Sequence, residues 1–186
     1  MTAVASPERL AALLRAADPL AAARAAGVAP AGAVAWSRGP DPGDWLLDGD
    51  AERPVAEHRA AHASGRPSVA ALAYGRGAEP ERIAARLHAL ALLAAETGLL
   101  RAVCPVPGDG TAGRPGSWGV EDLTVIAVCR LALPDGVRVR PHWRLLGAGT
   151  CQVAAAFGAD EWVLPEGSAD DPGHLAEAAG RTAVAR

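Results

Sequence analysis

Short apolar runs alternate along the chain with longer segments in which apolar residues recur every three or four positions. The apolar runs have the length of buried strands and cover residues 32–36, 68–75, 102–107, 137–143 and 160–165. The amphipathic segments have helical periodicity, and the main ones cover residues 53–64, 79–98, 120–133 and 144–158. Strands that alternate with helices in this way indicate βαβ units and a parallel sheet.

Local signals at the helix ends support this organisation. Ser6 and Pro7 are typical of a helix start, and Asp18-Pro19 separates that helix from a second, alanine-rich one. We predict a single domain with a helical segment over residues 1–30, βα repeats over 31–165 and a tail helix over 166–186. A closed eight-unit barrel takes about 250 residues. The 186 residues present here therefore predict either an open α/β sheet or a partial barrel.

The composition gives no sign of a nucleic-acid or membrane partner. Half of the residues are apolar, the formal net charge is −3, and all 18 basic residues are arginines. The charges are interspersed, so no basic stripe indicates a nucleic-acid surface. No apolar stretch reaches the ~18 residues of a membrane span, and the first residues lack the pattern of a signal peptide. We expect a cytoplasmic protein that binds neither nucleic acid nor membranes.

Cysteine and histidine spacing gives little support for a metal site. Cys104, Cys129 and Cys151 lie far apart and in no metal-binding spacing, so we predict buried free thiols. His58 and His62 are four residues apart and share a helix face. No third ligand follows nearby in the sequence, and we therefore favour ordinary packed histidines over a metal site.

Several motifs occur in a fixed order over about residues 15–165. They are Gly32-Ala33-Val34, Ala61-His62-Ala63-Ser64-Gly65, Tyr74-Gly75-Arg76 with Glu79 and Arg82, and the segments 119–147 and 152–161. In this order they resemble the later part of the radical S-adenosylmethionine (SAM) enzymes of the futalosine route to menaquinone. Those enzymes are aminofutalosine synthase and dehypoxanthine-futalosine cyclase, and the two halves of the deazaflavin F0 synthase are related to them.

The resemblance implies a TIM-barrel-like partial (βα) barrel of about four to five parallel βα units. The family binds its [4Fe–4S] cluster through a Cys-x-x-x-Cys-x-x-Cys loop, which this sequence lacks. That loop belongs upstream of the matching segments, so we expect the chain to begin after it. Val34 and Arg76 also stand where the family has an acidic residue and a histidine. Without the thiolates no cluster assembles to cleave SAM, so we expect no cofactor and no autonomous radical chemistry.

Two functional hypotheses follow from the resemblance. In the first, the chain is a catalytically incomplete relative that acts as a non-catalytic partner or regulatory protein. It would associate with itself or with a full-length radical SAM relative, because a partial barrel leaves unpaired strand edges. In the alternative, it is a binding protein or a repurposed non-radical enzyme for a nucleoside-like or aromatic carboxylate ligand in menaquinone metabolism. A further possibility is that the missing cluster region is encoded immediately upstream.

The carboxyl ends of barrel strands are where ligands bind in such folds. Residues near the predicted strand ends, together with one position carried over from the resemblance, give the candidate ligand-binding set: Tyr74, Arg76, Asp109, His142, Trp143 and Asp160. An aromatic side chain could stack on a planar ligand and a guanidinium could hold a carboxylate or phosphate. The ordinary alternatives are core packing for the aromatic residues and locally satisfied or solvated groups for the others. No catalytic residue is assigned.

Overall fold

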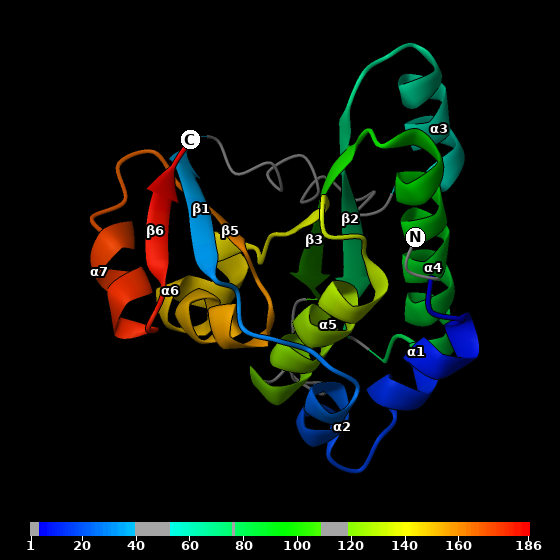
Figure 1. The fold of residues 1–186 in the computed structure, drawn as a ribbon, viewed down its shortest axis with the longest axis horizontal. Helices are drawn as coiled ribbons and strands as arrows, with labels where there is room; N and C mark the ends of the chain where they lie inside the picture. Colours follow the sequence, from blue (N-terminus) through cyan, green and yellow to red (C-terminus); the bar gives the residue numbers. More distant parts are fainter. Residues whose placement is uncertain (1–3, 40–52, 76, 109–118) are drawn as a thin grey trace.

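The computed structural model describes residues 4–39, 53–75, 77–108 and 119–186 (Figure 1). The helices are α1 (Pro7–Leu14), α2 (Pro19–Ala25), α3 (Val55–Ala63), α4 (Pro80–Thr97), α5 (Gly119–Ala132), α6 (Trp143–Ala154), the 3-10 turn η2 (Ala155–Phe157) and α7 (Pro172–Ala178). The strands are β1 (Ala33–Arg38), β2 (Ser68–Tyr74), β3 (Leu100–Pro107), β4 (Arg138–Val139), β5 (Glu161–Leu164) and β6 (Thr182–Ala185). The alternation of strands and helices predicted from the sequence is therefore confirmed.

The strands form two parallel sheets of three strands each, in the orders β5-β1-β6 and β2-β3-β4. The predicted TIM-barrel-like partial barrel of four to five βα units is wrong, because the strands form two sheets that do not close and the order β5-β1-β6 is not sequential. In a barrel, β1 would pair with β2, the next strand along the chain. Here β1 pairs with β5 on one side and with β6 on the other, so it has no edge left for β2.

The outer edge of β2 is covered by arginines instead of by a strand. Arg86 donates to the carbonyl oxygen of Ala71 from both Nε and Nη2, at 3.1 and 3.0 Å. Arg82 donates to the carbonyl oxygen of Ala73 at 2.9 Å. Both arginines belong to α4, the helix that follows β2. Charged side chains on an edge strand oppose pairing with a further strand, so this edge is protected.

Asp160 connects the two sheets. Its backbone N–H donates to the carbonyl oxygen of Val139 in β4 at 3.1 Å, and its Oδ1 accepts from the Val139 N–H at 2.8 Å. Asp160 lies directly before β5. This reciprocal pair of hydrogen bonds therefore holds the start of β5 beside β4.

The larger core packs α1, α2, α4 and α5 against the β2-β3-β4 sheet. In α4 the apolar positions Ile83, Leu87, Leu90 and Ala94 recur at helical spacing and are all buried. Full burial of each leucine stabilises the fold by about 1.5–3 kcal/mol. The helix ends at Gly98, whose φ of 64° is left-handed backbone that glycine adopts without strain. A smaller core surrounds Trp143 and Trp162 beside the other sheet.

The C-terminal tail contains more than the predicted helix. The helix is present as α7, but strand β6 follows it and adds to β1.

The three cysteines are buried free thiols, as predicted, and burial raises the pKa of the Cys129 thiol. Among the described helices, none is both long and apolar enough to span a membrane.

Candidate functional site

Four of the six candidate residues at the strand ends are described, and each has internal contacts. Tyr74 is 2% exposed, and its hydroxyl donates to Oδ1 of Asp122 at 2.7 Å. Asp122 lies in the first turn of α5, so this bond fixes the end of β2 to that helix. Arg76 and Asp109 lie outside the described residues.

His142 and Trp143 form the start of α6 instead of the end of a strand. The His142 side chain caps the helix, with Nδ1 accepting from the Leu145 N–H at 3.3 Å. Trp143 is buried and its Nε1 donates to Oδ2 of Asp170 at 3.2 Å. Its ring meets that of Trp162 edge to face, with centroids 5.7 Å apart. These contacts match the core-packing alternative for Trp143.

Asp160 is engaged by arginines as well as by backbone. Besides the Val139 N–H, its carboxylate binds Arg138 at 3.1 Å and lies 3.6 Å from Arg130. Because Asp160 precedes β5, it lies at the amino end of that strand, whereas Tyr74 lies at the carboxyl end of β2. The two residues thus lie at opposite strand ends and in different sheets, and the structure does not bring these two candidates to one site.

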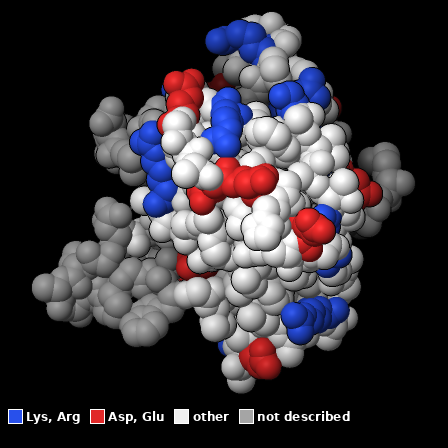
Figure 2. Space-filling view, turned by 90° about the vertical axis from the view of Figure 1, so that its left-hand side faces the viewer, with Lys and Arg blue, Asp and Glu red and all other residues white. Residues whose placement is uncertain are grey.

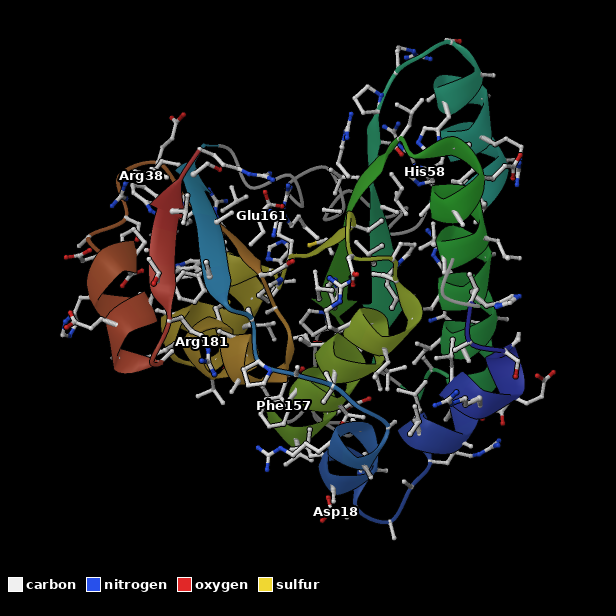
Figure 3. All side chains as sticks on the ribbon, in the orientation of Figure 1. Asp18, Arg38, His58, Phe157, Glu161 and Arg181 are labelled. Atoms are coloured by element: carbon white, nitrogen blue, oxygen red, sulfur yellow. The ribbon has the colours of Figure 1, made fainter. Side chains whose placement is uncertain are left out.

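A cluster that sequence analysis did not assemble lies between α3, β2 and α4. The Ser68 hydroxyl, at the start of β2, lies 3.0 Å from His58 Nδ1 and 2.8 Å from His62 Nε2. The Thr97 hydroxyl, at the end of α4, lies 2.8 Å from His62 Nδ1. Figure 3 labels His58 on α3, beside β2. The four-residue spacing of His58 and His62 was the sequence signal for this cluster, since it places both rings on one helix face.

The number of protons on each group determines which atom donates and which accepts in each hydrogen bond of this cluster. The Thr97 hydroxyl donates its single proton to the Leu93 carbonyl at 2.8 Å, so it accepts from His62 Nδ1–H. His62 Nε2 is then an acceptor and receives the Ser68 proton. Ser68 Oγ in turn accepts from His58 Nδ1–H, which leaves His58 Nε2 as a bare acceptor. That atom is buried and has no hydrogen-bond partner among the described residues.

The surroundings of both histidines favour the neutral imidazole. Burial lowers the pKa of His58, and the nearby positive charges of Arg86 and Arg53 lower it further. Burial also lowers the pKa of His62, with a smaller effect from Arg59. A neutral imidazole has one donor and one acceptor nitrogen, which is the state that the hydrogen-bond chain requires.

The cluster borders an open hollow of about 530 Å³. Ser68 and His58 line it together with Arg53, Glu57 and Arg66. Ser68 is partly exposed, whereas His58 and His62 are buried. A hydroxyl bonded to two imidazoles thus lies at the wall of a polar hollow. Among the described residues, no group of three or more side chains could hold a metal ion.

Acidification is expected to destabilise the fold through this cluster. Because the pKa values of His58 and His62 are lowered in the folded protein, the unfolded chain binds protons first as the pH falls. Above the ordinary histidine pKa of about 6.5, the two neutral histidines make their full contribution to the free energy of unfolding. That contribution decreases as the pH falls from there toward the lowered pKa values. Urea unfolding at successive pH values measures this. The variant with His58→Gln and His62→Gln should lose less stability on acidification than wild type, whereas His174→Gln, on the exposed face of α7, should follow wild type. An equal acid loss in all three proteins would contradict the expectation.

No family model matches the chain, and comparison with curated proteins gives no match.

Proposed function

We propose that this chain is a partner protein without radical SAM chemistry, of the lineage that its motifs resemble, and that it works as a self-associated assembly. The observation that carries the proposal is the outer edge of β6. The resemblance supplies the lineage, and the internal contacts of Tyr74, Trp143 and Asp160 support a role other than radical chemistry for these candidate residues.

The two outer edges of the sheets differ in their protection. The β2 edge is covered by Arg82 and Arg86. On β6, the Arg186 N–H donates to the Trp36 carbonyl, so alternation along the strand turns the backbone groups of Ala183 and Ala185 away from β1. Within the described part of the chain, no residue bonds to those outward groups. These outward N–H and C=O groups can therefore form hydrogen bonds with a further strand that pairs along the edge of β6.

A second copy of the chain fits this edge. An antiparallel pair of β6 strands centred on Val184 places Ala183 of each copy opposite Ala185 of the other, so the outward groups bond reciprocally across a two-fold axis. In the same register, Val184, which is 49% exposed, lies opposite Val184 of the second copy. The register also sets Arg186 against Thr182 and not against another arginine. The pairing therefore covers an exposed apolar side chain without opposing like charges.

The surrounding face also allows two copies to approach. Figure 2 shows the side of the molecule that carries β6 and α7 in Figure 1, and acidic and basic side chains are interspersed on it. A mixed surface does not repel its own copy as a single-sign patch would. The four residues of β6 give a small contact, so we expect weak, concentration-dependent pairing.

Light scattering on the full chain tests this proposal. The mass should rise from 18.8 kDa toward twice that value between micromolar and millimolar concentration. Ala185→Pro removes an outward N–H and should keep the protein monomeric at every concentration. Ala185→Thr retains the N–H and is the matched control, which should pair like wild type. A wild-type chain that stays monomeric throughout, or an Ala185→Pro variant that pairs normally, would overturn the proposal.

A further inference from the structure

We propose that Ser68 is a nucleophile for acyl transfer, with His62 as its general base and Thr97 as the residue that positions His62. The site lies at the amino end of β2, away from the strand ends considered above and away from the β6 edge. The inference is therefore independent of the proposed function.

The geometry of the three residues suits this chemistry. Ser68 Oγ lies 2.8 Å from His62 Nε2, within the range of a nucleophile and its base. The second ring nitrogen of His62 lies 2.8 Å from Thr97 Oγ1, which fixes the orientation and tautomer of the ring. Because Thr97 donates to the Leu93 carbonyl, it accepts from His62 and leaves Nε2 free to take the serine proton. Base and nucleophile are thus already aligned.

The surroundings indicate the substrate class. The hollow of about 530 Å³ beside Ser68 suits a small molecule rather than a polymer. Arg66 lies at its exposed rim, and no ion pair joins Arg66 to a described residue. A guanidinium in that position favours a substrate with a carboxylate. We infer a small carboxylate-bearing ester as the substrate class.

The reaction proceeds in two balanced steps. As Ser68 Oγ bonds to the ester carbonyl carbon, its proton passes to His62 Nε2. Collapse of the tetrahedral intermediate breaks the bond to the alcohol, which leaves with the proton from His62. Water then gives a proton to His62 Nε2 as its oxygen bonds to the acyl carbon. The bond to Ser68 Oγ breaks, Oγ takes the proton back from His62, and the carboxylic acid leaves.

Covalent labelling of the wild-type chain tests the nucleophile without any variant. A fluorophosphonate probe reacts with activated serines, and peptide mass spectrometry locates the adduct. We expect the adduct on Ser68 and none on Ser64, an exposed serine four residues earlier whose hydroxyl donates to the Ala60 carbonyl. No adduct on Ser68 at excess probe would overturn the proposal.

Hydrolysis of mono-(4-nitrophenyl) succinate, followed by release of nitrophenol, tests the other roles. Ser68→Ala should abolish hydrolysis, and Ser64→Ala should leave it unchanged. Thr97→Val should lower kcat by roughly 10²-fold with little change in KM, and Thr97→Ser should restore it, because general-base catalysis is typically worth 10²–10⁴-fold. Hydrolysis that persists in Ser68→Ala, or an equal loss in Thr97→Ser and Thr97→Val, would overturn the assignment. The wild-type labelling decides if Ser68→Ala does not fold.

Discussion

Glu161→Ala should lower the free energy of unfolding by about 3–5 kcal/mol, the cost of leaving a buried charge without its partner. Glu161 is 2% exposed, and one carboxylate oxygen binds Arg140 Nη2 at 2.6 Å and Nε at 2.8 Å. The other oxygen binds Arg186. Arg140 is itself only 9% exposed, so removal of the carboxylate leaves its charge inside the protein. Figure 3 labels Glu161 on β5.

Urea unfolding at low protein concentration measures this loss. Glu166→Ala is the matched control, since Glu166 is exposed and only five residues away, and it should change stability by less than about 0.5 kcal/mol. Arg186→Ala should cost less than Glu161→Ala, because Arg186 is largely exposed and Arg140 retains its partner. Equal stability of Glu161→Ala and wild type would contradict the buried ion pair.

Gly158→Ala should destabilise the fold by about 2–4 kcal/mol, through overpacking and left-handed backbone together. A Cβ at this position would lie 2.5 Å from Arg130 Cγ and 2.8 Å from Arg130 Cβ. Arg130 cannot move aside freely, because its guanidinium donates to three backbone carbonyls after α5, those of Val137, Leu133 and Pro134. Gly158 also has a φ of 91°.

Two glycines separate the steric cause from the backbone cause. Gly27 has a φ of 100° but nothing within 4 Å of an added Cβ, so Gly27→Ala should cost only the backbone strain, about 1 kcal/mol. Gly32 has neither constraint, and Gly32→Ala should be close to neutral. Thermal unfolding of the three variants checks the order. A Gly158→Ala protein as stable as Gly27→Ala would contradict the close contact with Arg130.

Periodicity predicted the elements well because it reports local burial. The run at residues 68–75 became β2, and the amphipathic segment 79–98 became α4 within a residue at each end. Strand order is a different property. Nothing in the pattern of β1 indicates that it lies between β5 and β6, because that depends on which edges pair. β6 was missed since its pattern is short and largely exposed.

For the candidate site too, local features could be predicted from the sequence, whereas contacts between distant residues could not. The sequence pattern correctly placed Tyr74 at the end of a strand. It did not reveal that Asp122, 48 residues away, would bind the Tyr74 hydroxyl. The spacing of His58 and His62 predicted a shared helix face. The third and fourth members of their cluster, Ser68 and Thr97, come from a strand and from the end of another helix. The packing of α3 against β2 and α4 brings the four residues together.

Amide exchange by NMR, followed residue by residue along β6, tests the proposed pairing most directly. The Thr182 and Val184 amides face β1 and should be protected at every protein concentration. The Ala183 and Ala185 amides face outward, and we expect them to exchange rapidly in dilute solution and to become protected as concentration rises. Ala185→Pro should abolish the concentration-dependent protection at Ala183. Rapid exchange of Ala183 and Ala185 at all concentrations would contradict pairing through β6.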